Sequence, residues 1–213
     1  MRGYYFITGA SLSKAGDISD VRKAVKARVS VIQMRAKGGD PEEIFRKARV
    51  LRKICRDSIF LVNDRVDIAL SVGADGVHLG RGDMSLESAR ALLGPGKIIG
   101  VTVRSLEQAV QAEKEGADYI GAGPVFKTTT KTDAGEPLGI GFLGELKRTV
   151  SIPIAAIGGI TPSNLPDVVE AGADLVCSIA PVVTSSDVEA EILKYQSLFR
   201  QVRPLRLLRT VRD

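Results

Sequence analysis

A three-residue phrase, Gly-Ala-Asp, occurs three times in this chain and constrains its fold more than any other feature. It stands at residues 73–75, 116–118 and 172–174. Each copy follows a stretch with helical periodicity and precedes a short apolar run, which reads GVHLG, YIGAG or LVCSI. A glycine just past a helix supplies the left-handed residue that ends it, and the apolar run is typical of a buried strand. The phrase therefore marks the helix-to-strand loop of a repeating unit.

Reading outward from these loops predicts eight strand and helix pairs. The predicted strands lie near residues 4–8, 29–34, 59–62, 76–79, 97–101, 119–122, 154–157 and 175–179. The predicted helices lie near residues 20–27, 41–56, 65–72, 85–93, 106–115, 141–150, 162–171 and 187–199. Short continuous apolar strands are typical of a parallel sheet covered by helices. The sequence therefore predicts an α/β fold, a single-domain TIM (β/α)8 barrel over residues 1–199, followed by a basic C-terminal tail at 200–213. A doubly wound open sheet is the alternative, disfavoured because no glycine-rich dinucleotide loop follows the first strand.

Composition narrows the classes of partner. No apolar run approaches the roughly 20 residues that a membrane span needs, and the first residues lack the pattern of a signal peptide, so we expect a cytoplasmic protein without a membrane partner. Of the net charge of +5, the tail carries +4, from five arginines and one aspartate. Without aromatic platforms or a reading motif, this tail does not predict nucleic-acid binding. A homo-oligomer is compatible with the sequence. Cys55 and Cys177 have no metal-type spacing and are interpreted as small buried residues.

Two carboxylates follow neighbouring predicted strands. Asp64 comes after the strand at 59–62, and Asp83 after the strand at 76–79. Parallel strands about 5 Å apart bring their carboxyl ends to one edge of the sheet, so we expect both side chains there. Magnesium is usually held by one or two carboxylates together with phosphate oxygens of a substrate. The pair therefore predicts a Mg²⁺ site with a phosphorylated ligand.

Other predicted strands end in groups that suit an anion. Gln33, Arg35 and Lys37 alternate after the second strand and are expected to share the barrel mouth, where an inward arginine needs an anionic partner. A long loop after the sixth strand carries Thr128, Thr129, Thr130 and Lys131, which suits a phosphate-binding lid. Glycines after the seventh strand allow a ligand to approach the backbone. His78 lies within a strand and is interpreted as a packed or hydrogen-bonded barrel residue, not a catalytic base. The sequence therefore predicts an electrostatic site without a histidine triad or a nucleophilic cysteine.

Taken together, these motifs resemble the thiamin phosphate synthase family from Tyr4 to about Val183. The motifs that carry the resemblance are Gln33-Met34-Arg35-Ala36-Lys37, Asn63-Asp64-Arg65, Gly76-Val77-His78-Leu79-Gly80 with Asp83, Gly123-Pro124-Val125-Phe126 with Thr128, Thr130 and Lys131, and Ala156-Ile157-Gly158-Gly159-Ile160. The resemblance implies a transferase of thiamin biosynthesis. It would join 4-amino-5-hydroxymethyl-2-methylpyrimidine diphosphate to 4-methyl-5-(2-hydroxyethyl)thiazole phosphate and release pyrophosphate by a dissociative, carbocation route.

The resemblance also implies roles for individual residues. Arg35, Lys37 and Lys131 would be catalytic, and Asp64 and Asp83 would hold Mg²⁺. The pyrimidine diphosphate would contact Gln33, Arg35, Lys37, Asn63, Thr102 and Lys131. The thiazole phosphate would contact Thr128, Thr130 and Gly159 and the backbone at Ile179 and Ala180, with Thr129 in the same loop.

This chain departs from the family pattern at a few positions. Thr102 stands where the family often has serine and keeps the hydroxyl. Ala180 stands where the family often has a serine after the eighth strand, so only backbone amides remain there for the thiazole phosphate. Since one neutral hydrogen bond contributes about 0.5–1.5 kcal/mol, we expect a modest loss of phosphate affinity. Lys127 replaces the usual proline and adds a cation that offsets this loss.

Two other functions remain alternatives. A thiazole tautomerase, an isomerase, resembles the synthase in fold but has a proton-transferring histidine where this chain has Pro124. A non-catalytic regulator that binds thiazole phosphate would share the same site residues, so only an assay separates it from an enzyme.

Overall fold

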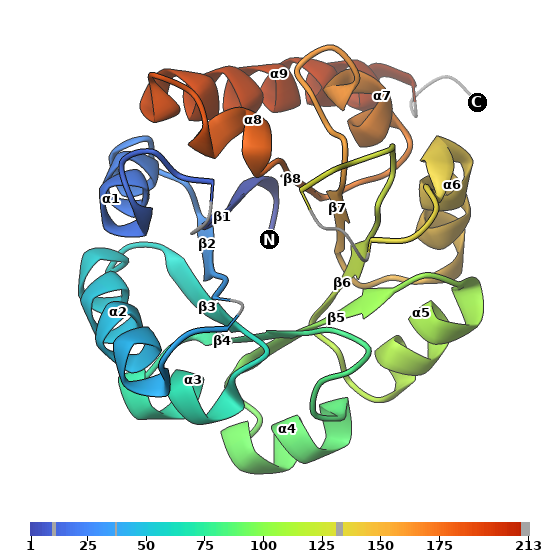
Figure 1. The fold of residues 1–213 in the computed structure, drawn as a ribbon. Helices are drawn as coiled ribbons and strands as arrows, with labels where there is room; N and C mark the ends of the chain where they lie inside the picture. Colours follow the sequence, from blue (N-terminus) through green and yellow to red (C-terminus); the bar gives the residue numbers. More distant parts are fainter. Residues whose placement is uncertain (10–11, 37, 131–133, 210–213) are drawn as a thin grey trace.

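Eight parallel strands close into a barrel at the centre of the molecule, and helices surround it (Figure 1). This computed structural model describes residues 1–9, 12–36, 38–130 and 134–209, with residues 203–209 described by their backbone alone. The strands are β1 (Gly3–Ile7), β2 (Val31–Met34), β3 (Ile59–Asn63), β4 (Gly76–Leu79), β5 (Ile98–Val103), β6 (Tyr119–Ala122), β7 (Ile154–Ile157) and β8 (Leu175–Cys177). Each strand pairs in parallel with the next, and β8 pairs with β1, where Leu175 lies opposite Gly3. The predicted TIM barrel is confirmed.

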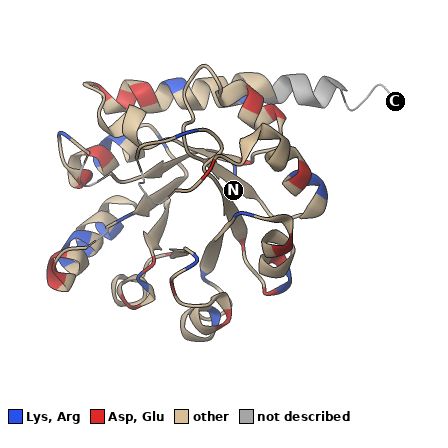
Figure 2. Cartoon of the chain, turned by 45° about the vertical axis from the view of Figure 1, so that its right-hand side comes forward, with Lys and Arg blue, Asp and Glu red and all other residues tan. Residues whose placement is uncertain are grey.

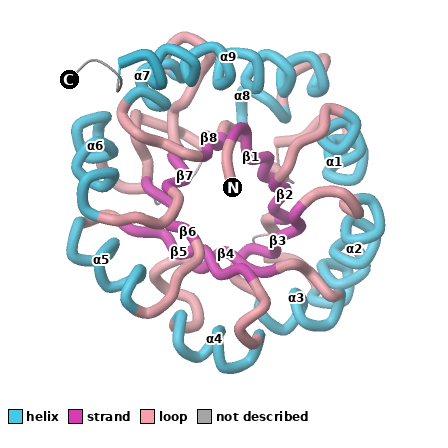
Figure 3. Tube along the Cα trace, turned by 180° about the vertical axis from the view of Figure 1, so that it is seen from behind, coloured by secondary structure: helices cyan, strands magenta, loops and turns pink. Residues whose placement is uncertain are grey.

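The helices form the outer layer, as the view from the opposite side also shows (Figure 3). They are α1 (Asp17–Lys26), α2 (Pro41–Ile54), α3 (Val66–Val72), α4 (Leu86–Leu93), α5 (Leu106–Lys114), α6 (Gly139–Thr149), α7 (Leu165–Glu170), α8 (Ala180–Val183) and α9 (Val188–Arg209). Figure 2 shows charged residues on these helices and on the loops, whereas the strands are largely uncharged. No helix within the described ranges has the length and apolar character needed to cross a membrane.

Two elements near the C-terminus differ from the sequence prediction. The strand predicted at 175–179 ends at Cys177, and the chain then turns into the short helix α8. Pro181 lies in the first turn of this helix, and proline cannot donate to a strand ladder. The helix predicted to end at 199 continues to Arg209. Val202 is buried, so the apolar contact of α9 extends into a stretch whose arginines suggested a tail.

The repeated Gly-Ala-Asp phrase has one structural role in all three places. Its glycines have positive φ angles of 64°, 86° and 120°, and its alanines are buried. In each copy the aspartate carboxylate accepts a hydrogen bond from an amide of the strand before the helix: Asp75 from Phe60 (2.8 Å), Asp118 from Ile99 (2.7 Å) and Asp174 from Ile154 (3.2 Å). The aspartate amide donates back to the carbonyl of that same residue at 2.9 Å in every copy. The phrase therefore fastens each helix-to-strand loop to the preceding strand.

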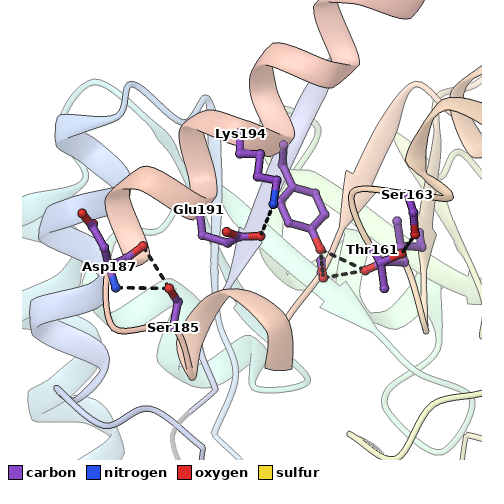
Figure 4. Close-up of polar contacts among 9 residues, drawn as sticks. Thr161, Ser163, Ser185, Asp187, Glu191 and Lys194 are labelled. Carbon is purple, nitrogen blue, oxygen red and sulfur yellow. Dashed lines mark hydrogen bonds and ion pairs between the residues drawn. The ribbon is translucent and has the colours of Figure 1, made fainter.

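The last helix, α9, packs on the outside of the barrel where its first and last strands meet. It packs against α1, α7 and β1. The Lys26 ammonium lies 2.8 Å from the Glu189 carboxylate, and the Gln196 amide donates to the Ala27 carbonyl at 3.1 Å. In the turn before α9, the Ser185 hydroxyl accepts from the Asp187 amide at 3.1 Å (Figure 4). These contacts fix α9 against α1, beside the junction where β8 pairs with β1.

Candidate active site

One cavity of about 680 Å³ opens at the carboxyl ends of the strands and receives residues from all eight of them. The residues that the sequence predicted for the site and that line this cavity are Gln33, Arg35, Asn63, Asp64, Asp83, Thr102, Thr128, Thr129, Thr130, Gly159, Ile179 and Ala180. Positions far apart in the sequence are therefore brought together as expected. Lys37 and Lys131 lie outside the described residues, so their place relative to the cavity stays a prediction.

The two carboxylates follow adjacent strands, β3 and β4, and line the cavity. Asn63 of β3 lies opposite His78 of β4, and the Asp64 amide donates to the His78 carbonyl at 2.9 Å. Asp64 has a φ of +63°, a left-handed conformation that asparagine and aspartate tolerate better than most residues. In the next loop, one Asp83 carboxylate oxygen accepts the Gly80 amide at 2.6 Å. Among the described residues, no group of three or more His, Cys, Asp and Glu side chains is arranged around a metal position.

Cations from several loops line the cavity, and the sequence analysis had not placed Arg81 or Arg104 among them. The Arg35 amide donates to the Thr8 hydroxyl at 2.9 Å, which joins the end of β2 to the end of β1. The Arg35 side chain is half-buried and lines the cavity. Arg81 and Lys127 also line it and are exposed. This positive charge suits an anion, because guanidinium and ammonium groups pair readily with phosphate oxygens.

Glycines after β7 form a side of the cavity that is mostly backbone. Gly158 and Gly159 have φ angles of +100° and +65°, which other residues rarely adopt. The Gly158 carbonyl accepts the Phe126 amide at 3.0 Å, so the loop after β6 lies against this turn. A Cβ atom on Gly159 would lie 2.6 Å from the Lys127 carbonyl oxygen. Glycine is therefore required here both by its conformation and by the close approach of the two loops.

The loop after β8 is held against the loop after β7. The buried Ser178 hydroxyl donates to the Ile160 carbonyl at 2.8 Å, and the Tyr195 hydroxyl of α9 donates to the same carbonyl at 3.1 Å. Beyond these contacts, Thr161 and Ser163 pair through their hydroxyl oxygens at 2.9 Å (Figure 4). Ile179 and Ala180, which come directly after Ser178 in the sequence, line the cavity. Backbone after strands seven and eight is where TIM barrels commonly bind phosphate.

Arg104 fastens the long loop after β6, a role that sequence reasoning missed. Its guanidinium donates to the carbonyls of Gly123 (3.1 Å), Ala134 (2.5 Å) and Glu136 (2.7 Å). One side chain at the end of β5 thus holds both described ends of the loop that carries the three threonines. Arg104 comes two residues after Thr102, and residues two apart in a strand share a face. This spacing could have predicted that Arg104 lies on the same side as Thr102.

The floor of the cavity is formed by polar groups inside the barrel. Tyr5, His78 and Tyr119 line it and are linked by hydrogen bonds. His78 is a hydrogen-bonded barrel residue, as the sequence predicted. Burial raises the pKa of Tyr5 and of Tyr119 well above the usual range, so both phenols stay neutral. Cys177 is also on this floor, and burial raises the pKa of its thiol, which therefore stays protonated, as expected of a packed residue rather than a nucleophile.

The fold and this cavity define a class: a (β/α)8-barrel enzyme whose functional groups lie at the carboxyl ends of the strands. Residues 4–182 match the family model described as thiamine monophosphate synthase, and the chain belongs to that family. It is 46% identical over 201 residues to thiamine-phosphate synthase of Methanosarcina barkeri, covering 94% of this chain and 91% of the relative. It is 44% identical over 189 residues to thiamine-phosphate synthase of Shouchella clausii, covering 87% and 90%.

Solved structures agree with this assignment. The structure of thiamine phosphate pyrophosphorylase from Pyrococcus furiosus superposes with a TM-score of 0.87 at 39% identity, covering 94% of this chain and 96% of that one. The family resemblance expected from the motifs is thus confirmed.

Proposed function

We propose that this protein is a thiamin phosphate synthase. It transfers the aminopyrimidine, through its methylene carbon, from 4-amino-5-hydroxymethyl-2-methylpyrimidine diphosphate to the ring nitrogen of 4-methyl-5-(2-hydroxyethyl)thiazole phosphate. Pyrophosphate is the leaving group. The observation that carries the proposal is the convergence of Asp64, Asp83 and Arg35 on one cavity in a member of this family. Its partners are these two small molecules.

The two carboxylates fit a magnesium ion. Asp64 and Asp83 lie on adjacent strand ends and are hard oxygen donors, and two carboxylates leave most of an octahedral shell to phosphate oxygens and water. One Asp83 oxygen is already oriented by the Gly80 amide, which fixes the direction of the other. When bound, Mg²⁺ supplies positive charge to the diphosphate that leaves.

The remaining residues divide the cavity between the two substrates. Gln33, Asn63 and Thr102 hold the pyrimidine, and Arg35, with Lys37 and Lys131 as predicted partners, holds its diphosphate. The thiazole phosphate lies against Gly159, the backbone of Ile179 and Ala180, and the hydroxyls of Thr128, Thr129 and Thr130. Support for this division comes from the opposite placement of the groups: Arg35 and the carboxylates follow β2 to β4, whereas the glycine turn follows β7.

The chemistry follows from these charges. The bond between the pyrimidine methylene and the diphosphate oxygen breaks with its electron pair on pyrophosphate, and Arg35 stabilises the charge that develops there. The electron-rich aminopyrimidine stabilises the methylene cation. The thiazole nitrogen, positioned by its distant phosphate, donates its electron pair to form the new carbon–nitrogen bond. Neither step needs a nucleophile or base from the protein.

A direct assay tests the proposal. The protein is mixed with both substrates and magnesium, and thiamin phosphate and pyrophosphate are followed in time. Equal amounts of both products are expected. Absence of thiamin phosphate above the level of a mixture without protein would exclude synthase activity and leave the tautomerase and the non-catalytic regulator.

The tautomerase alternative is disfavoured by one residue. Pro124 lines the cavity where that family has its proton-transferring histidine, and proline cannot transfer a proton. Conversion of the thiazole substrate into an isomer by this protein alone would reverse this preference.

Arg104→Ala is expected to weaken binding of the thiazole phosphate. Without the guanidinium, the loop that carries Thr128 and Thr130 loses its three carbonyl contacts, and its ordering has to come from the ligand. We expect the KM for thiazole phosphate to rise about tenfold, since each charged hydrogen bond contributes about 1.5–3 kcal/mol and part is regained on binding. Steady-state kinetics measure both KM values. The KM for the pyrimidine diphosphate is expected to rise as well, because the same loop carries Lys131. A KM for thiazole phosphate equal to that of the parent would contradict this role of Arg104.

A further inference from the structure

Five polar side chains from five strands form a single chain of hydrogen bonds across the cavity floor. The Gln33 amide nitrogen donates to the Tyr5 hydroxyl, whose oxygen lies 3.0 Å from that of Tyr119. The Tyr119 hydroxyl lies 2.9 Å from His78 Nδ1, and His78 Nε2 lies 2.9 Å from the Thr102 hydroxyl. All five line the cavity. We call this series of five hydrogen-bonded side chains the relay.

Two glycines make room for the relay, because a side chain at either position would collide with one of its rings. A Cβ atom on Gly100 would lie 2.0 Å from Tyr119 Cζ, and one on Gly121 would lie 2.8 Å from His78 Cε1. The rings also contact one another: the centroids of Tyr5 and Tyr119 are 6.1 Å apart, and those of His78 and Tyr119 are 5.5 Å apart. Side chains held this tightly lose little further freedom when a ligand binds, so they suit positioning.

Proton counting gives the relay a direction. Each phenol has one proton and neutral histidine has one, so a fully bonded chain passes one proton per link in a single sense. Among the described residues, the Tyr5 hydroxyl has Gln33 and Tyr119 as its hydrogen-bond partners. Since Gln33 donates to it through an N–H, we assign the Tyr5 proton to Tyr119 and the Tyr119 proton to His78 Nδ1. His78 then donates from Nε2 to the Thr102 oxygen. The raised pKa values of Tyr5 and Tyr119 keep both phenolic protons in place near neutral pH.

The two ends of the relay are therefore opposite in character. Gln33 uses an N–H within the relay and keeps its amide oxygen as an acceptor for the cavity. Thr102 accepts within the relay and keeps its hydroxyl proton as a donor for the cavity. Reversing one end requires reversing every link, including a turn of the Gln33 amide. The relay thus couples two groups on β2 and β5 that do not touch each other.

We propose that Tyr119 and His78 are positioning residues that act through Gln33 and Thr102 to select a pyrimidine with an amino donor at one edge and a ring-nitrogen acceptor at the other. The inference rests on the proposed function and adds to it the basis of ring selection. A 4-oxopyrimidine diphosphate presents an acceptor where the amino compound presents a donor. It would face the Gln33 oxygen with its own oxygen, and buried polar groups left unpaired lower binding strongly.

The test is Tyr119→Phe, which removes the central hydroxyl and keeps the ring. We expect the KM for the amino pyrimidine diphosphate to rise about tenfold and its preference over the 4-oxo analogue to fall about tenfold, with the KM for thiazole phosphate unchanged. His78→Phe is expected to do the same, and His78→Gln to restore part of the preference, because an amide can both donate and accept. If Tyr119→Phe does not fold, Tyr5→Phe is measured in its place. This variant breaks the neighbouring link of the relay, so the same changes are expected.

Tyr4→Phe is the matched control. Tyr4 is equally buried, and its hydroxyl donates to the Ser178 carbonyl at 2.7 Å, outside the relay. Its ring preference should equal that of the parent. A folded Tyr119→Phe variant with the parent's KM and preference would overturn the proposal.

The relay can be tested even if the parent forms no thiamin phosphate. Calorimetry then compares binding of the amino and 4-oxo pyrimidine diphosphates without the thiazole. Binding with a preference that Tyr119→Phe weakens would support the relay while the synthase assignment fails. A parent that binds neither compound, or binds both equally, would overturn the relay as well.

Discussion

Asp64→Asn is expected to lower thiamin phosphate formation by about a thousandfold, the upper end for loss of one electrostatic group in an active site. The variant removes one negative charge and keeps the size of the side chain. It also keeps the backbone, because asparagine tolerates the left-handed conformation that residue 64 adopts, whereas alanine would add strain. Loss of activity can then be assigned to the missing charge. The measurement is product formation over a magnesium titration, with thermal melting as the test of folding.

Asp83→Asn is the companion change. The asparagine oxygen can still accept the Gly80 amide, so the loop is retained while the charge is lost. Asp67→Asn is the matched control, since Asp67 of α3 is exposed, pairs with Arg65 and is not among the residues that line the cavity. If Asp64→Asn and Asp83→Asn both kept parental rates at every magnesium concentration, neither residue would be a metal ligand.

Arg35→Ala is expected to lower kcat by about 10²- to 10³-fold, because the leaving pyrophosphate would lose the guanidinium group that we propose stabilises its charge. The backbone of Arg35 stays fixed by its contact with Thr8, so the effect is confined to the side chain. Arg35→Lys is expected to recover only part of the rate, since an ammonium cannot form the two parallel bonds of a guanidinium. Single-turnover experiments separate this loss from product release.

Arg46→Ala serves as the control for Arg35→Ala. Arg46 is an exposed arginine of α2 that pairs with Glu42 one helical turn away. Its removal should leave kcat unchanged. A kcat for Arg35→Ala within about twofold of the parent, far below the loss expected of such a group, would show that Arg35 does not act on the leaving group.

The sequence predicted the barrel and most of the cavity because both depend on local patterns. Gly73, Gly116 and Gly172 end helices, so they located the strands that follow, and polar residues directly after those strands had to meet at one end. Asp83 follows the strand located by Gly73, whereas the position of Asp64 was predicted from the apolar run at 59–62 just before it. The family motifs added the chemistry of the substrates.

What the sequence could not predict depends on distances between strands. Tyr5 and Tyr119 look like ordinary apolar strand residues, and only the closed barrel brings their hydroxyls within 3.0 Å. Arg104 was missed because its partners, Gly123, Ala134 and Glu136, belong to a loop whose path has no periodic pattern. The length of α9 was underestimated because five arginines hid the apolar contact that Val202 continues.

The three aspartate fastenings and the junction of β8 with β1 together have a consequence for how this protein is made. Each fastening joins residues within 20 positions of one another, so successive units can form while the chain is still leaving the ribosome. Pairing of β1 with β8 must wait until Leu175 has been synthesised, because it joins Gly3 to Leu175. Until then the incomplete sheet has two unpaired edge strands, which can form hydrogen bonds with another chain. Pairing of β8 with β1 removes both edges, and the final helix, α9, packs against β1 beside this junction.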